Sequence, residues 1–322
     1  MGRLHCLVLL LSLYSSEAAS EGGKHWCYLS QMCHDPACEE PRAWNLLDSE
    51  CGKNRQSPIN IITSKVQYNW ELGPFSFKNY DTEQEKNWTI KNNGHSVQVM
   101  LDGSATVASG GLSGTYKAVQ FHFHWGNNES RGTGTTVSSG SEHSIDGERY
   151  AMELHIVHIK NEHASLDEAL LKKGVAVLGF FIELGEENQN YNPLISNFKH
   201  IPYEDNATWM APLPLGSLIP KKDDLTKYYR YTGSLTTPLC NEDVEWTLFQ
   251  KPIQLALDQI QEFWMKLYFG KTKQWAMVDN FRPVQPVNGR IVYKSESNAL
   301  LSPAKALLLI PMVTSLALAL IQ

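Results

Sequence analysis

Two short segments carry residues that could hold a metal ion, Gln-Phe-His-Phe-His-Trp at 120–125 and Glu-Leu-His-Ile-Val-His at 153–158. In an extended strand, alternate side chains point to opposite faces. His122 and His124 would therefore share one face, and His155 would join them if the second segment is a neighbouring strand. Three imidazole ligands with a fourth position left to water are typical of a catalytic zinc site.

Two polar residues stand beside these histidines. Gln120 lies two residues before His122, and Glu153 lies two residues before His155, each on the face of its histidine. A metal-bound imidazole commonly donates its other N–H to an amide or a carboxylate. The alternative is a set of surface or satisfied core histidines, which is the more common meaning of a His-x-His pair alone. The third histidine and the polar neighbours favour the metal site.

The composition is that of an ordinary globular protein, with 42% hydrophobic residues and a net charge of -6 over 322 residues. The sequence has no basic block of the kind that binds phosphates, which argues against a nucleic-acid partner. No internal repeat or linker divides the chain, so we expect a single large domain.

The spacing of apolar residues predicts mostly strands. Short alternating segments separated by Gly, Pro and Asn, such as 88–90, 95–101 and 175–183, indicate a sheet-rich fold. One helix is expected near the end, where apolar residues recur at steps of three and four: Ile253, Leu257, Ile260, Trp264 and Leu267. Residues 126–140, rich in Gly, Ser and Thr, are expected to form a loop between the two histidine segments.

Both ends of the chain resemble processing signals. Residues 1–20 carry Arg3, an apolar run and small residues, as a cleaved secretory signal does, and the run is too short for a membrane anchor. Residues 306–321 are uncharged and follow small and polar residues at 295–299, which is typical of a glycosylphosphatidylinositol (GPI) signal. Residues 297–322 would form this signal, whose hydrophobic tail is removed, and Ser297 or Ser295 would carry the lipid. A short single-pass helix is the alternative.

Other features agree with export. N-glycosylation sequons begin at Asn87, Asn128 and Asn206. Without the signal, the chain keeps five cysteines, so we expect two disulfides and one leftover thiol, with pairing open: Cys27, Cys33, Cys38, Cys51 and Cys240. A bridge between Cys51 and Cys240 would close a loop of about 190 residues, contribute about 4 to 5 kcal/mol in the chain-entropy model and tether residues 236–237.

A set of ordered motifs resembles the alpha-class carbonic anhydrases, with the likeness running from about His25 to Lys294. The motifs are Ser-Pro-Ile-Asn at 57–60, Asn-Asn-Gly-His at 92–95, the two histidine segments, Gly-Ser-Glu-His-Ser-Ile-Asp-Gly at 140–147, Gly-Ser-Leu-Thr-Thr-Pro at 233–238 and Asn-Phe-Arg-Pro at 280–283. The resemblance implies a monomeric zinc lyase that hydrates CO2 to bicarbonate. It also implies one α+β domain at 21–296, built around a large, mostly antiparallel twisted sheet with short peripheral helices.

The resemblance assigns roles to individual residues. His122, His124 and His155 would bind Zn2+, supported by Gln120, Glu153 and the backbone of Asn280. A zinc-bound hydroxide would attack CO2, oriented by Thr236 and Glu142. Thr237 would contact bicarbonate, beside an apolar wall for CO2 formed by Val157, Val177, Leu235 and Trp246. Without the resemblance, Thr236 is a turn residue and the wall residues belong to the core.

His95 stands at the family's proton-shuttle position, where an imidazole with a pKa near 6.5 suits proton transfer at physiological pH. Tyr28, Asn93 and Gln98 match positions that order the water chain, although asparagine is common in place of Gln98. His143 and His158 are expected to be structural and packed away from the zinc. Without the resemblance, His95 is an exposed histidine in a turn.

The signal, the apolar tail, Cys51 and Cys240 resemble the extracellular, lipid-anchored branch of the family, which implies the outer face of the plasma membrane. Bicarbonate or acid–base transporters suit such a position as partners, although no residue specifies one. Cys33 has no counterpart, and a Cys27–Cys38 bridge is the preferred pairing. Residues 126–140 are longer than in many relatives.

Two other functions are compatible with parts of the sequence. An acatalytic binding relative would lack one or more of the histidines, whereas this chain keeps all three together with Glu142 and Thr236. Hydrolysis of small esters would use the same hydroxide and is expected as a weak side activity.

Overall fold

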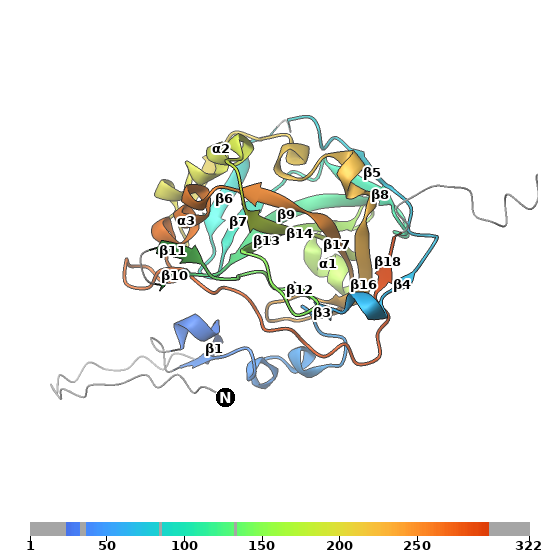
Figure 1. Cartoon of the computed structure of the whole chain (residues 1–322), viewed down its shortest axis with the longest axis horizontal. Helices are drawn as coiled ribbons and strands as arrows, with labels where there is room; N and C mark the ends of the chain where they lie inside the picture. The colour runs from blue at the N-terminus through green and yellow to red at the C-terminus, as the bar shows by residue number, and fades with distance from the viewer. Residues whose placement is uncertain (1–23, 33–36, 84–85, 132–133, 296–322) are drawn as a thin grey trace, which may run out of the picture.

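The computed structural model describes residues 24–32, 37–83, 86–131 and 134–295. A twelve-stranded sheet spans the molecule, with short helices around it (Figure 1). Most of its strands follow one path. Outside this path, β8 (Thr106–Ser109) pairs with β9, and β5 (Phe75–Lys78) pairs with β8. The path runs β15 (Ala207–Met210), β6 (Trp88–Asn92), β7 (Val97–Met100), β9 (Tyr116–Trp125), β13 (Met152–Lys160), β14 (Val175–Leu184), β17 (Glu242–Leu255), β16 (Tyr228–Ser234), β18 (Tyr293–Lys294) and β4 (Gln67–Tyr68).

The pairing is mostly antiparallel, as expected for this fold class. Parallel pairs occur between β14 and β17 and between β18 and β4. Three small two-stranded sheets are formed by β1 (His25–Trp26) with β2 (Cys38–Glu39), β3 (Asn60–Ile61) with β12 (Ser144–Ile145), and β10 (Asn128–Arg131) with β11 (Gly134–Val137). The α-helices are α1 (Leu166–Leu171), α2 (Asn192–Ile195) and α3 (Leu257–Lys266). None of the helices described is long and apolar enough to cross a membrane.

The two histidine segments form the adjacent central strands β9 and β13. On one face, Phe123 lies opposite Leu154 and Phe121 lies opposite Ile156, and all four are fully buried in the main core. Helix α3 covers this face, with the ring of Phe263 centred 5.3 Å from that of Phe123. Burial of this apolar face determines the register, since a slip of one residue would turn every side chain to the wrong side.

Two predictions from the local pattern were wrong. The helix begins at Leu257, and Ile253 belongs to β17, where it pairs with Ile182 of β14. The expected loop at 126–140 contains the hairpin of β10 and β11. Pairing of backbone groups is enough to form a hairpin, so a composition of Gly, Ser and Thr does not exclude one.

Candidate metal centre

The register between β9 and β13 brings the three histidines together. His155 lies directly opposite His122, and Glu153 lies opposite His124, so the three rings share one face of the sheet. Their ring centroids are 4.7 to 5.2 Å apart. One ring nitrogen of each histidine lies within 4.8 Å of the others, which is close enough for all three to bind one ion.

Each ring is oriented by a different acceptor on its outer nitrogen. Nδ1 of His122 lies 2.9 Å from Oε1 of Gln120, and Nδ1 of His124 lies 2.7 Å from the carbonyl oxygen of Asn280. Nε2 of His155 lies 2.7 Å from Oε1 of Glu153. If each of these nitrogens carries the proton, Nε2 of His122, Nε2 of His124 and Nδ1 of His155 keep free lone pairs for a metal.

The residues present fit zinc. Nε2 of His124 is buried and has no hydrogen-bond partner among the described residues, although a buried polar atom normally has one. Burial, followed by the neighbouring His124 and His155, holds the pKa of His122 well below 6.5, and burial also lowers the pKa of His124. Both rings are therefore neutral at physiological pH, and the neutral imidazole is the form that binds a metal.

Glu153 connects the centre to a buried hydrogen-bond chain. Its carboxylate also accepts bonds from Nδ1 of His143 at 2.7 Å and from the His143 backbone N–H at 2.8 Å. With its Nδ1 proton donated, His143 accepts at Nε2 from the hydroxyl of Tyr231 at 2.7 Å, and Tyr231 accepts from Ser57 at 2.7 Å. Burial alone would raise the pKa of Glu153, but His143 and His155 outweigh it and hold that pKa well below its usual value.

His143 is therefore closer to the centre than the sequence suggested, since one carboxylate separates it from His155. Ser57 and His143 lie in two of the sequence motifs and could have been recognised as members of this hydrogen-bond chain. No local signal in the sequence identified Tyr231. His158, by contrast, lies on the other face of β13, where Nε2 contacts the hydroxyl of Tyr80 and Nδ1 lies 2.9 Å from the carbonyl of Ile156.

Glu142 lies beside the free ring nitrogens. It is fully buried, and its Oε1 accepts a bond from the backbone N–H of Arg282 at 2.8 Å. Its Oε2 lies 3.4 Å from Nε2 of His124 and 3.9 Å from Nδ1 of His155, and has no hydrogen-bond partner among the described residues. The expected bond from Thr236, which is 5% exposed, is thus not made to this oxygen in the structure.

A cavity of about 220 Å³ opens over the histidines. It brings together most of the residues assigned to the reaction: Gln98, Gln120, His122, His155, Val157, Val177, Leu235, Thr236, Thr237 and Trp246. It is also lined by Leu166, Asp167 and Leu170 of α1 and by Pro238 and Leu239. The sequence reasoning missed α1, because a six-residue helix carries little periodicity.

His95 lies elsewhere. Its ring stacks on Trp26 with centroids 3.6 Å apart, and the two residues line a separate pocket that also contains His25 and Glu204. Burial, with a smaller effect of His25, lowers the pKa of His95 to about 4, so the expected pKa near 6.5 does not hold for this position of the ring. Nδ1 of His95 has no hydrogen-bond partner within the described part of the chain.

Two other residues expected to order water have structural contacts. Oδ1 of Asn93 accepts bonds from the backbone N–H groups of His95 and Ser96, at 3.0 and 2.8 Å, and so closes the turn that carries His95. Tyr28 is 1% exposed, and burial raises its pKa well above 10. Its ring centroid lies 6.2 Å from that of His95.

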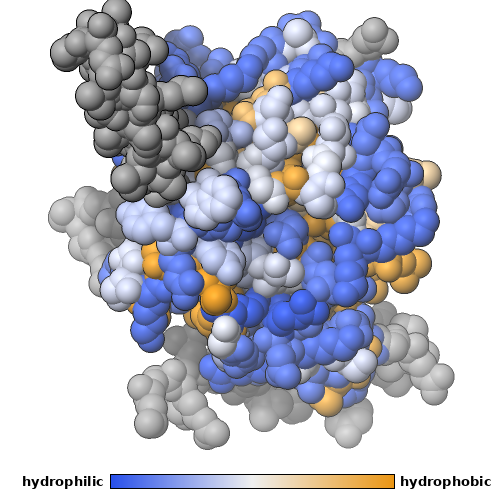
Figure 2. All heavy atoms as spheres, turned by 90° about the vertical axis from the view of Figure 1, so that its right-hand side faces the viewer, coloured by the Kyte–Doolittle hydropathy of each residue, from blue (hydrophilic) through white to orange (hydrophobic). Residues whose placement is uncertain are grey.

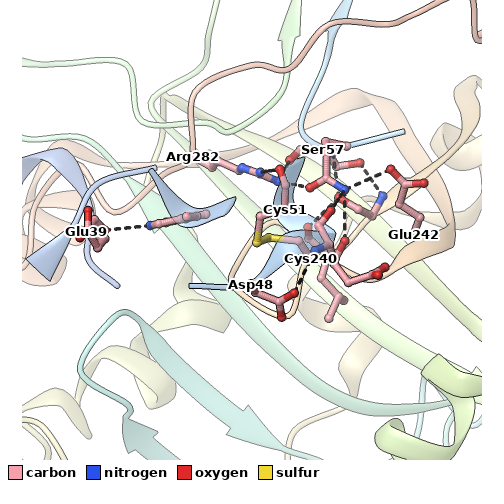
Figure 3. Close-up of a disulfide and its surroundings, with 12 residues drawn as sticks. Glu39, Asp48, Cys51, Ser57, Cys240, Glu242 and Arg282 are labelled. Atoms are coloured by element: carbon pink, nitrogen blue, oxygen red, sulfur yellow. Dashed lines mark hydrogen bonds between the residues drawn. A yellow bond between two sulfur atoms is a disulfide. The ribbon is translucent and has the colours of Figure 1, made fainter. Parts of the chain in front are cut away.

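The structure contains the disulfides Cys27–Cys38 and Cys51–Cys240, and Cys33 lies outside the described residues. The second bridge is surrounded by hydrogen bonds of Arg282, which donates to Gln56 at 2.8 Å and to the carbonyls of Ser57 and Cys51 (Figure 3). The backbone N–H of Cys240 donates to the carbonyl of Thr237 at 2.9 Å. Arg282 thus joins the surroundings of the bridge to Glu142, a role that the Asn-Phe-Arg-Pro motif at 280–283 did not reveal.

The residues expected to be glycosylated or to carry the lipid differ in their burial. Asn87 and Asn128 are exposed, and Asn206 is half-buried with its Oδ1 accepting from the Tyr203 backbone at 3.1 Å. Ser295 is fully buried, and its hydroxyl donates to the carbonyl of Thr226 at 2.8 Å. Ser297 lies outside the described residues.

Comparison with known proteins agrees with this geometry. The family model described as eukaryotic-type carbonic anhydrase matches residues 39–296. Carbonic anhydrase 4 of Oryctolagus cuniculus is 41% identical over 302 residues, covering 93% of this chain and 94% of the relative. Carbonic anhydrase 4 of Rattus norvegicus is 40% identical over 96% of this chain and 97% of the relative, and carbonic anhydrase 12 of Homo sapiens is 33% identical over 97% and 84%. The chain belongs to the eukaryotic-type carbonic anhydrases, zinc-dependent lyases that hydrate carbon dioxide.

Proposed function

We propose that this chain hydrates CO2 reversibly at the outer face of the plasma membrane, with a hydroxide as nucleophile and His95 as proton carrier. The observation that carries the proposal is the convergence of His122, His124 and His155, of which His122 and His155 line the cavity. Each ring is oriented by a hydrogen bond at its outer nitrogen. The buried Nε2 of His124 has no partner among the described residues.

The three histidines would hold the zinc, and Gln120, Asn280 and Glu153 would fix their rings. When bound, zinc supplies the activation of water, lowering its pKa from 15.7 to about 7, a magnitude for which carbonic anhydrase is itself the reference case. Glu153 adds negative charge behind His155, which makes that ring a more basic ligand.

Glu142 and Thr236 would orient the nucleophile. Oε2 of Glu142, which has no partner among the described residues, can accept a hydrogen bond from the hydroxyl of Thr236. The oxygen of that hydroxyl can in turn accept a hydrogen bond from the hydroxide. This sequence of bonds would aim an oxygen lone pair at the carbon of CO2, and correct orientation can lower a barrier by several kcal/mol. Arg282 holds the other oxygen of Glu142 in place.

The cavity wall would hold the substrate. CO2 has no charge and no hydrogen-bond donor, so the apolar surface of Val157, Val177, Leu235 and Trp246 suits it. Thr237, the residue that follows Thr236, would contact the bicarbonate product. Esterase activity on small esters would use the same nucleophile.

His95 would carry the proton to solvent after leaving the ring of Trp26. In the stacked, half-buried position, the His95 ring has a pKa of about 4. It is therefore a poor proton acceptor at neutral pH. In a solvated position its pKa returns toward about 6.5, which allows it to accept and release protons near neutral pH. Tyr28, Asn93 and Gln98 would support the water chain that reaches it.

Export and anchoring complete the proposal. We place the GPI lipid on Ser297 rather than Ser295, because Ser295 is buried and hydrogen-bonded to the strand beside it. The signal at 1–20, the sequons at Asn87, Asn128 and Asn206 and the two disulfides fit a secreted monomer. Bicarbonate or acid–base transporters remain the proposed class of membrane partner.

Stopped-flow CO2 hydration by the purified protein, before and after zinc removal, tests the activity. We expect hydration to disappear with the metal and to return with added zinc. Hydration that persists without metal would contradict the proposal, whereas ester hydrolysis that exceeds CO2 hydration would favour an esterase. Release from cells by a phosphatidylinositol-specific phospholipase tests the anchor.

A further inference from the structure

The described chain ends beside an edge of the large sheet. β18 pairs in parallel with β4, the last strand of the path, so that Lys294 lies opposite Tyr68. The backbone N–H of Asn69 donates to the carbonyl of Lys294 at 3.1 Å. Residue 295 follows immediately, so the described chain ends next to β4, two residues before the proposed lipid site at Ser297 in the sequence.

Large side chains project from this edge. Trp70 is 80% exposed and Tyr68 is 67% exposed, and Ile291, just before β18, is 43% exposed. The ammonium group of Lys294 lies 5.7 Å from the ring centroid of Tyr68. We call Tyr68, Trp70, Ile291 and Lys294 the edge patch; its nearest acidic neighbour in the sequence is the exposed Glu71.

The surrounding surface does not look like a protein interface. Figure 2 faces the side of the molecule on which β4 and β18 lie, and the visible surface is mostly hydrophilic, with apolar side chains in small separate patches. A stable dimer needs a broad, well-packed interface of roughly 1,200 Å² or more. The edge patch instead combines two aromatic rings with a cation, a combination that suits a boundary between apolar and aqueous phases.

We propose that the edge patch contacts the headgroup region of the bilayer to which this chain is anchored. The inference rests on the lipid anchor proposed above. Trp and Tyr are enriched at membrane–water interfaces because their rings are apolar at one end and polar at the other. Lys294 can pair with lipid phosphates, while the tether keeps the patch close to the bilayer, so that even a weak contact is populated.

The contact would set how the enzyme sits on the membrane. β14, β17, β16 and β18 separate the zinc-binding strands from β4 in the sheet. The sheet would therefore stand with its β4 edge toward the lipid and its metal centre several strands away. Residues of the edge patch line no part of the cavity over the histidines, so changing them leaves CO2 hydration intact.

Lipid-dependent quenching of tryptophan fluorescence tests the contact. The full-length anchored protein is placed in phosphatidylcholine nanodiscs, with or without lipid carrying a nitroxide near the headgroup. We compare the natural chain with Trp70→Phe and with Trp209→Phe. Trp209 is a matched control, because it is 70% exposed on β15, at the opposite end of the strand path.

We expect the nitroxide to quench emission of the natural chain and of Trp209→Phe, and most of this quenching to be lost in Trp70→Phe. CO2 hydration should be equal in all three, which shows that each is folded. Quenching that survives in Trp70→Phe would overturn the contact. Absence of quenching in all three proteins would also overturn it, provided that phospholipase treatment of a parallel sample shows the protein to be GPI-anchored. A concentration-dependent dimer that buries Trp70 would also overturn it. A chain that the phospholipase does not release would overturn the anchor and this inference with it, while leaving CO2 hydration untouched.

Discussion

The three histidines of the candidate metal centre differ in what holds them. His122 and His124 are held by neutral acceptors, an amide and a backbone carbonyl, whereas His155 is held by the carboxylate of Glu153. The same carboxylate accepts two bonds from His143. Because charged hydrogen bonds are roughly twice as strong as neutral ones, Glu153 is the strongest of the three supports.

Replacing Glu153 with Gln should therefore weaken zinc binding. An amide of the same shape has no charge, so it weakens the bonds that His143 and His155 both make to Oε1. Its NH2 group would also replace Oε2 and face the backbone N–H of His143, where no hydrogen bond can form. We expect zinc affinity to fall about 10- to 100-fold, measured by competition with a soluble chelator. Glu183→Gln, on β14 but away from the histidines, serves as the control. Equal affinities for the two variants would show that the charge on Glu153 has no effect on the metal.

His95 offers a test of how its environment sets its pKa. Burial against Trp26 lowers this pKa to about 4. Trp26→Ala removes the ring that covers it, so the pKa should rise toward about 6.5, as followed by NMR titration of the His95 ring. If the stacked position limits proton transfer, CO2 hydration at neutral pH should also become faster. A titration still centred near 4 would mean that Trp26 does not cause the shift.

At the scale of elements, a strand can place unlike groups on its two faces. β13 carries His155 on the cavity face and His158 on the core face, where His158 is fully buried. Such alternation is local, so the sequence alone could predict which histidines share a face, whereas the pairing of β9 with β13 that brings His155 to the other two is seen only in the fold. The contribution of α1 to the cavity, the strand position of Ile253 and the β10–β11 hairpin depend on distant partners, which single-segment patterns do not contain.

The buried His158 predicts how stability depends on pH. Burial lowers its folded pKa to about 4, while the unfolded value is 6.5. Above pH 6.5 both states are neutral. As the pH falls from 6.5 to 4, the unfolded state takes up a proton that the folded state does not, so His158 should cost up to about 3 kcal/mol of stability. Denaturant unfolding across this range should show a shallower loss for His158→Asn.

The exposed His200 gives the control for that experiment. His200→Gln should keep the pH dependence of the natural chain, since it replaces a histidine on the surface and leaves the buried His158 in place. If His158→Asn lost stability on acidification as steeply as His200→Gln, the titration of His158 would not contribute.

At the scale of the whole molecule, one cross-link joins distant segments at the centre. Cys51 and Cys240 are 189 residues apart, and Arg282 joins their surroundings to Glu142 through hydrogen bonds to Cys51, Ser57 and Gln56. The family resemblance pointed to the two cysteines, but the buried guanidinium appeared only in the folded chain. Its bonds join segments that sequence spacing does not relate.

The two disulfides should therefore differ in what they stabilise. In the chain-entropy model, the Cys51–Cys240 bridge contributes about 5 kcal/mol and Cys27–Cys38, which closes a separation of 11 residues, about 3 kcal/mol. Replacing both cysteines of one pair with serine and measuring denaturant unfolding compares them. Because Cys240 bonds to the carbonyl of Thr237, loss of its bridge should also slow CO2 hydration, whereas loss of the other should affect hydration less. Equal losses of stability in the two variants would mean that loop length does not govern stability here, and unchanged hydration without the long bridge would show that residues 236–237 hold their place without it.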